Sequence, residues 1–123
     1  MECPRVTLTD LTLTDRKPLV MVTAYDAASA RLPDSAGVDL ILVGDTLAEF
    51  TLGYDSTTPV TVNEMLHHCQ AVTRIQPRAF VVGDMPLGSY QVSKEEAVRN
   101  AIRFVKEGGV DAVKIEGGKV REE

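Results

Sequence analysis

The sequence predicts an α/β fold of parallel strands that alternate with helices, and two observations support this prediction. Short apolar runs without polar alternation, such as Leu40–Val43 and Phe80–Val82, are typical of strands buried on both faces of a parallel sheet. Segments with helical periodicity separate the apolar runs in the order β-α-β-loop-α-β-α-β. This alternation is typical of architectures that take about 250 residues, so we expect the 123 residues to be part of a larger fold.

In the first half of the chain, Leu19–Ala24 is the first predicted strand and Asp26 is a candidate N-cap for the helix that follows. We expect Pro33 to break or kink this helix, because proline clashes with the carbonyl group four residues earlier. The second strand is predicted at Val38–Val43. A long loop is then predicted at Asp45–Pro59, where glycine, proline and aspartate residues favour turns.

In the second half, Thr61 and Glu64 form a capping-box pattern at the start of a helix, and Ser93 opens another helix. The third and fourth strands are predicted at Ala79–Val82 and Ala112–Glu116. Helical spacing predicts an apolar stripe on the first of these helices, comprising Met65, Leu66, Cys69 and Val72. It predicts an apolar face on the second helix, comprising Ala97, Ala101, Ile102 and Val105.

The composition is that of an ordinary soluble protein, with 44% hydrophobic residues, 25% charged residues and a formal net charge of −5. The 13 Lys and Arg residues are scattered, which argues against nucleic-acid or anionic-membrane partners and favours a small-molecule substrate. Cys3 and Cys69 indicate a reducing compartment without a disulfide framework. No apolar stretch approaches the ~20 residues of a membrane span, so we expect a cytoplasmic protein.

Two carboxylates stand at the carboxyl ends of successive predicted strands, Asp45 after the second and Asp84 after the third. Active sites of barrels built from alternating strands and helices lie at these ends. Since neighbouring strands are about 4.8 Å apart, both side chains can reach one cation between them. The sequence therefore predicts a shared site for Asp45 and Asp84.

Lys114 and Glu116 extend this candidate site from the fourth strand, because residues two apart in a strand point to the same face. Asp45, Asp84 and Glu116 provide oxygen ligands, and Lys114 provides a countercharge for an anionic substrate. The absence of Cys and His from these positions favours Mg²⁺, or Mn²⁺, over a structural zinc site.

Structural interpretations of the same residues remain open at this point. A strand-end aspartate often only caps the next helix, and Lys114 with Glu116 forms a plausible internal ion pair. His67, His68 and Cys69 resemble a metal cluster in composition, but consecutive helical residues point in different directions.

Several motifs resemble ketopantoate hydroxymethyltransferase, also called 3-methyl-2-oxobutanoate hydroxymethyltransferase, over nearly the whole chain from Val6 onward. The motifs are Met21–Asp26, Leu42–Asp45, Leu52–Thr57 with Pro59–Thr61, Gly83–Pro86 with Gly88–Tyr90, and Val113–Gly118. Their common order and spacing make this resemblance specific.

The resemblance implies a (β/α)8 TIM barrel, of which residues 1–123 form about the first four strands as a single partial domain. It implies transfer of a hydroxymethyl group from 5,10-methylenetetrahydrofolate to 3-methyl-2-oxobutanoate, giving 2-dehydropantoate for pantothenate and coenzyme A biosynthesis. It also implies a homo-oligomer, a decamer in this family, in the cytoplasm. We expect this chain to be inactive alone, since the resemblance places the catalytic general base beyond Glu123.

The resemblance further implies that Asp45 and Asp84 bind Mg²⁺ directly, and that Glu116 contacts the metal through water. Asp45, Thr46, Asp84 and Lys114 match the positions that hold the keto acid, and Thr46 stands where the family usually has serine. Two alternatives remain beside this function. One is a 2-oxo acid lyase of the phosphoenolpyruvate mutase type, and the other is a non-catalytic half-barrel that at most binds metal or keto acid.

Overall fold

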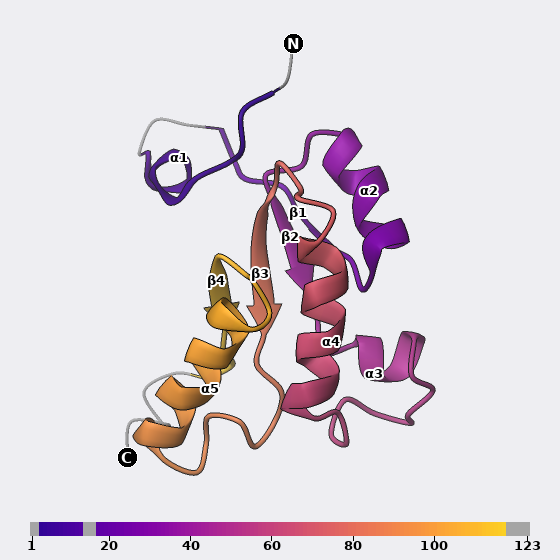
Figure 1. Cartoon of the computed structure of the whole chain (residues 1–123), viewed down its shortest axis with the longest axis vertical. Helices are drawn as coiled ribbons and strands as arrows, with labels where there is room; N and C mark the ends of the chain where they lie inside the picture. Colours follow the sequence, from indigo (N-terminus) through magenta and orange to yellow (C-terminus); the bar gives the residue numbers. More distant parts are fainter. Residues whose placement is uncertain (1–2, 14–16, 118–123) are drawn as a thin grey trace.

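The computed structural model describes residues 3–13 and 17–117, which form one parallel sheet with helices between the strands (Figure 1). The strand order in the sheet follows the chain, β1-β2-β3-β4, and every neighbouring pair is parallel. This arrangement confirms the predicted α/β fold of parallel units, as in part of a (β/α)8 barrel. The strands are β1 (Met21–Thr23), β2 (Leu40–Val43), β3 (Phe80–Asp84) and β4 (Ala112–Lys114).

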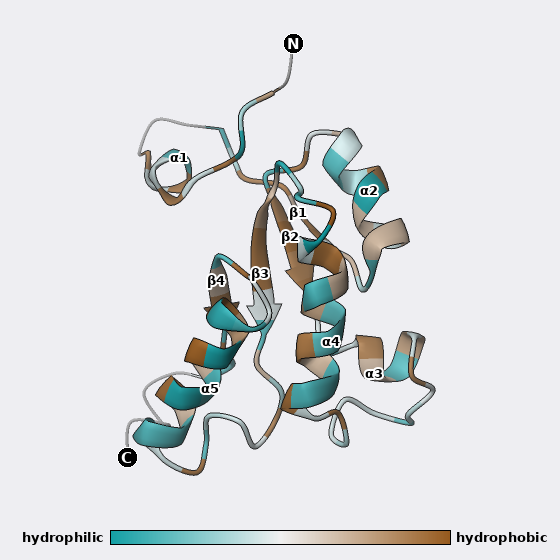
Figure 2. Cartoon of the chain, in the orientation of Figure 1, coloured by the Kyte–Doolittle hydropathy of each residue, from teal (hydrophilic) through white to brown (hydrophobic). Residues whose placement is uncertain are grey.

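The three longer helices cover one face of the sheet: α2 packs against β2, α4 against β2 and β3, and α5 against β4 (Figure 1). The helices are α1 (Leu8–Thr12), α2 (Ala27–Ser35), α3 (Leu47–Phe50), α4 (Val62–Thr73) and α5 (Lys94–Lys106). Figure 2 shows hydrophobic strands beside helices that alternate between hydrophobic and hydrophilic residues. The main core therefore lies between the sheet and these helices.

Helix α4 confirms the predicted capping box and apolar stripe. The Thr61 side chain accepts a hydrogen bond from the Glu64 backbone N–H, and the Glu64 side chain accepts one from the Thr61 backbone N–H. All four predicted stripe residues are buried, and Met65 and Cys69 are 0% exposed. This stripe attaches α4 to the middle of the sheet.

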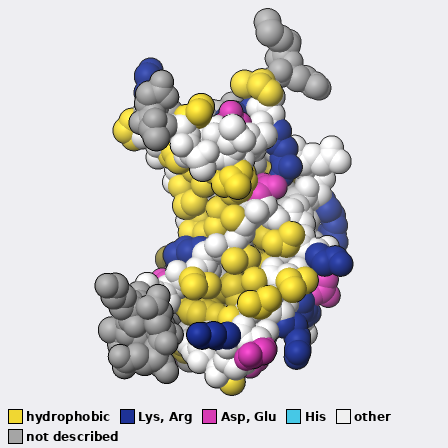
Figure 3. Space-filling view, turned by 90° about the vertical axis from the view of Figure 1, so that its left-hand side faces the viewer, with side chains coloured by type: hydrophobic (Ala, Val, Ile, Leu, Met, Phe, Trp, Pro, Cys, Tyr) yellow, Lys and Arg dark blue, Asp and Glu magenta, His cyan; other side chains and the backbone are white. Residues whose placement is uncertain are grey.

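The opposite face of the sheet is covered less completely. Val6 of the N-terminal segment packs there against Leu40, Phe80 and Val82, and its backbone N–H donates to the Arg78 carbonyl oxygen. Strand β1 is exposed along its length. Figure 3 shows hydrophobic side chains gathered in a band down this side of the molecule. The two faces of the sheet thus differ in how well their apolar residues are covered.

All four strands differ in their boundaries from the sequence prediction, and β2 begins at Leu40 instead of Val38. Strand β1 covers only the middle of Leu19–Ala24, since it lies at the edge and pairs only with β2 among the described strands. Strand β3 extends past Val82 to Asp84, because Asp84 pairs with Lys114 in the parallel register. Strand β4 ends at Lys114 instead of Glu116, so Glu116 lies in the segment that follows it.

The expected helix break at Pro33 is wrong, because α2 continues through it to Ser35. Pro33 lacks the N–H that would donate to the Ser29 carbonyl oxygen, but the helix ends two residues later at Ser35, so little of the helix follows the lost bond. The next residue, Asp34, also anchors this turn, since its carboxylate accepts hydrogen bonds from the backbone N–H groups of Arg78 and Ala79. Tertiary contacts thus offset the local cost of the proline.

Two further predictions need correction. The predicted loop Asp45–Pro59 contains the short helix α3, which forms because Leu47 and Ala48 are fully buried in the core. On α5 the buried residue is Phe104, whereas Ile102 is 51% exposed. The Phe104 ring occupies the space over Gly83, where an added Cβ would lie 2.6 Å from the ring. Helix α5 therefore packs against the sheet through Phe104.

Both cysteines are free thiols, Cys3 exposed and Cys69 buried in the predicted apolar stripe of α4. Burial raises the pKa of the Cys69 thiol to about 12. Among the described helices, none is sufficiently long and apolar to cross a membrane.

Candidate active site

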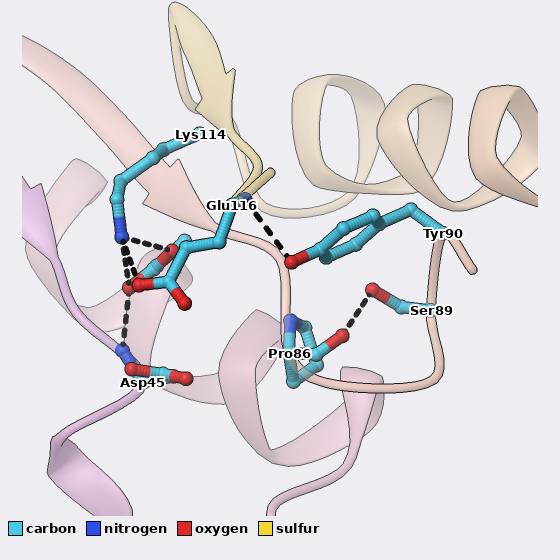
Figure 4. Close-up of polar contacts among 7 residues, drawn as sticks. Asp45, Pro86, Ser89, Tyr90, Lys114 and Glu116 are labelled. Atoms are coloured by element: carbon cyan, nitrogen blue, oxygen red, sulfur yellow. Dashed lines mark hydrogen bonds and ion pairs between the residues drawn. The ribbon is translucent and has the colours of Figure 1, made fainter. Parts of the chain in front are cut away.

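The parallel register brings the predicted acidic and basic side chains together at the carboxyl ends of the strands (Figure 4). The Asp45 backbone N–H, just after β2, donates to Asp84 Oδ2 at 3.2 Å. The Lys114 ammonium group donates to Asp84 Oδ1 at 3.2 Å and to Glu116 Oε1 at 3.3 Å. Three strand ends thus contribute to one cluster of charges.

Carboxylates outnumber the ammonium group among these four side chains. Asp84 is only 4% exposed. Burial, followed by the negative charge of Asp84, raises the pKa of Asp45 to about 6. Burial alone would lower the pKa of Lys114, but Asp84 and then Glu116 outweigh it, and the pKa is raised. The cluster therefore has an excess of negative charge that a bound cation would offset.

The donor chemistry of the cluster fits a hard divalent cation such as Mg²⁺ or Mn²⁺, because the available ligands are carboxylate oxygens. Within residues 3–13 and 17–117, no three acidic, His or Cys side chains already converge as a ready metal site. Lys114 instead lies between Asp84 and Glu116. Contact of a single cation with Asp45, Asp84 and Glu116 stays a prediction.

Glu116 is positioned by its backbone, since its side chain is 75% exposed. Its backbone N–H donates to the Tyr90 hydroxyl at 3.0 Å (Figure 4). Tyr90 belongs to the segment between β3 and α5, where the Ser89 hydroxyl donates to the Pro86 carbonyl oxygen at 2.6 Å. The segment that follows β3 thus fixes the backbone of the segment that follows β4.

Thr46 lies at the edge of the cluster and contacts a residue that the sequence analysis did not single out. Its hydroxyl is 2.8 Å from the Tyr25 hydroxyl, part-buried between the ends of β1 and β2. The only sequence signal for Tyr25 was its place directly after a predicted strand, within a family motif. An aromatic residue at a strand end is common, so this signal alone did not indicate a role.

The structural interpretations can now be compared with the geometry. Neither strand-end aspartate caps a helix: the N-cap of α3 is Thr46 and that of α5 is Ser93. Lys114 does form ion pairs, but with Asp84 as well as Glu116. The His68 ring nitrogen Nδ1 is 2.7 Å from the Tyr25 carbonyl oxygen. This contact gives His68 a structural role.

The sequence model of the ketopantoate hydroxymethyltransferase family matches residues 5–123. The chain belongs to this family. A 3-methyl-2-oxobutanoate hydroxymethyltransferase of Koribacter versatilis is 55% identical over 121 residues, which make up 95% of this chain and 41% of that protein. Another from Ignicoccus hospitalis is 61% identical over 101 residues, 82% of this chain and 38% of that protein. The chain thus spans about two fifths of these relatives.

Solved structures with a similar fold include a member of the PEP mutase/isocitrate lyase superfamily. A 2,3-dimethylmalate lyase superposes with a TM-score of 0.60 at 24% identity, over 85% of this chain and 35% of that chain. An oxaloacetate acetylhydrolase gives a TM-score of 0.60 at 16% identity, over 77% of this chain and 33% of that chain. At these identities the likeness concerns the fold alone. The family match therefore favours the transferase over the lyase alternative.

Proposed function

We propose that this chain supplies the metal-binding and keto-acid-binding part of an enzyme that transfers a hydroxymethyl group from 5,10-methylenetetrahydrofolate to 3-methyl-2-oxobutanoate. The product is 2-dehydropantoate, on the route to pantothenate and coenzyme A. The observation that supports this proposal is the meeting of Asp45, Asp84 and Lys114 at the carboxyl ends of the strands, in a chain of this family.

Asp45 and Asp84 would hold Mg²⁺ or Mn²⁺ directly, and Glu116 would contact it through water. When bound, the cation supplies Lewis-acid stabilisation of the negative charge that develops on the keto acid as a proton leaves C3. The excess of negative charge in the cluster supports this assignment, because a cation relieves the repulsion between Asp45 and Asp84.

Lys114 and Thr46 would bind the carboxylate of the keto acid. The Lys114 side chain is 38% exposed, so its ammonium group is accessible to an incoming anion. A charge-assisted hydrogen bond from this group to a carboxylate is about twice as strong as a neutral one. The Thr46 hydroxyl can supply a second donor from the end of β2.

The rest of the reaction is proposed for an enzyme of the length of these relatives. The tetrahydrofolate co-substrate, the general base, the decameric homo-oligomer and the cytoplasmic location are proposed for the whole enzyme. We expect the 123-residue chain alone to show no hydroxymethyl transfer, although it retains the keto-acid site. A non-catalytic fragment that binds metal and keto acid is compatible with the same geometry, and downstream coding sequence distinguishes the two.

Calorimetric titration with 3-methyl-2-oxobutanoate, with and without Mg²⁺, tests the proposed site. We expect Mg²⁺-dependent binding by the unaltered chain and its loss in Asp45→Ala and in Asp84→Ala. Asp55→Ala, in the exposed loop before α4, is the matched control and should bind normally. Undiminished binding by both site variants would contradict the shared site.

A further inference from the structure

Tyr25 is held at three points by three different segments of the chain. Its backbone N–H donates to the Ser29 hydroxyl at 2.9 Å, and its carbonyl oxygen lies 2.7 Å from His68 Nδ1. Because a carbonyl oxygen only accepts, Nδ1 of His68 carries the proton. The Tyr25 hydroxyl is 2.8 Å from Thr46 Oγ1, and its ring packs against the main core. The hydroxyl of Tyr25 therefore has a defined position.

Thr46 uses its hydroxyl in an unusual way for its place in the chain. It is the N-cap residue of α3, yet it makes no capping hydrogen bond, because its backbone is helical (φ −59°, ψ −14°) instead of extended as at a typical N-cap. Gly44 leaves room for the hydroxyl, since an added Cβ would lie 3.1 Å from Thr46 Oγ1. A local preference broken in this manner often marks a functional position.

We infer that Tyr25 is a positioning residue that orients the Thr46 hydroxyl toward the carboxylate of a 2-oxo acid. Either hydroxyl can donate in this 2.8 Å contact. We assign the Tyr25 O–H as the donor, because this leaves the Thr46 O–H free to donate to the anion. If the Thr46 O–H instead donated to Tyr25, Thr46 would present only the lone pairs of its oxygen to a negatively charged ligand. Two hydrogen bonds in a row also polarise each other and strengthen both. This inference rests on the proposed function.

Tyr25→Phe tests the role, because it removes the hydroxyl and keeps the ring. We expect the Mg²⁺-dependent dissociation constant for 3-methyl-2-oxobutanoate to rise about 3- to 10-fold, the value of one neutral hydrogen bond. Tyr54→Phe is the matched control: it removes a hydroxyl that donates to Glu64 Oε1 at 2.8 Å, in the first turn of α4. It should leave the affinity unchanged, even if both variants lose similar thermal stability.

Thr46→Val separates positioning from a general structural effect, since valine keeps the shape of threonine without its hydroxyl. If Tyr25 acts through Thr46, adding Tyr25→Phe to Thr46→Val should weaken binding no further. Additive losses in the double variant, or unchanged affinity in Tyr25→Phe, would overturn this inference while the proposed site stands. An unaltered chain that binds no keto acid would overturn both.

Discussion

Aspartates at the two ends of the sheet have different surroundings. At the amino ends of the strands, Asp34 accepts hydrogen bonds from the backbone N–H groups of Arg78 and Ala79. Asp111 likewise accepts from the Val81 N–H and pairs with Arg5. At the carboxyl ends, Asp84 lies close to Asp45, and burial and this like charge raise the Asp45 pKa to about 6.

The same residue type thus meets backbone donors at one end of the sheet and a like charge at the other. A carboxylate that accepts backbone N–H groups satisfies donors that would otherwise be buried without partners. At the carboxyl end, the ammonium group of Lys114 offsets only part of the negative charge of Asp45, Asp84 and Glu116. A bound cation would therefore stabilise the carboxyl end, and removing a charge there should have effects opposite to those at the amino end.

The largest expected effect on folding is that of Asp34→Ala. It leaves two backbone N–H groups without an acceptor, one of them on Ala79, which is 0% exposed. The free energy of unfolding should fall by about 2 to 3 kcal/mol, the cost of buried unsatisfied donors. Urea denaturation at pH 7 measures it, with Asp55→Ala expected to stay within about 0.5 kcal/mol of the unaltered chain. Equal stabilities would mean that the amino-end aspartates are not structural.

Lys114→Ala should affect binding more than folding. Loss of a hydrogen bond to a charged ligand should weaken keto-acid affinity about 10- to 100-fold. The unfolding free energy should change by at most about 1 kcal/mol, because the ion pairs of Lys114 are partly exposed. Calorimetry and urea denaturation of the same samples compare the two effects, with Lys106→Ala on exposed α5 as control. Unchanged affinity with reduced stability would favour the internal ion pair.

Asp45→Asn should have the smallest effect and the opposite sign to Asp34→Ala. The pKa of Asp45 is about 6 in the folded chain, against the ordinary value of 3.8 for an unfolded chain, so the folded chain binds the proton more tightly. Proton binding at Asp45 therefore stabilises the fold fully below pH 3.8, and this contribution to the free energy of unfolding is lost as the pH rises through about 6. Asparagine is neutral at every pH. Without divalent cations, Asp45→Asn should therefore be more stable than the unaltered chain at pH 8 by about 1 kcal/mol, after allowing for solvent screening.

Urea denaturation at pH 8 and at pH 4 measures this difference, which should largely disappear at the lower pH. Asp34→Asn is a useful companion, because it replaces a charged acceptor of backbone N–H groups with a neutral one and should be destabilising at pH 8. If both asparagine variants changed stability in the same direction, the contrast between the two ends of the sheet would be wrong.

The sequence by itself determined the order of the four strands and the three longer helices, the start of α4 and the strand-end positions of Asp45 and Asp84. These features are local: apolar runs define buried strands, and the Thr61 capping box depends on residues three apart. The resemblance to the family also depended only on motifs along the chain. The start of α2 also follows from local sequence. Its continuation through Pro33 does not, because Asp34 anchors the last turn to the distant residues Arg78 and Ala79.

Only the tertiary structure decided which groups from distant segments contact each other. The register of β3 with β4 places Lys114 beside Asp84, and the packing of α4 brings His68 to the Tyr25 carbonyl oxygen. Asp34 and Asp45 are the same residue type near strand ends, and no local pattern separates them. Their surroundings differ because Asp34 accepts hydrogen bonds from backbone N–H groups, whereas Asp45 lies close to a second carboxylate, that of Asp84. These contacts join distant segments, and they depend on packing that local sequence does not encode.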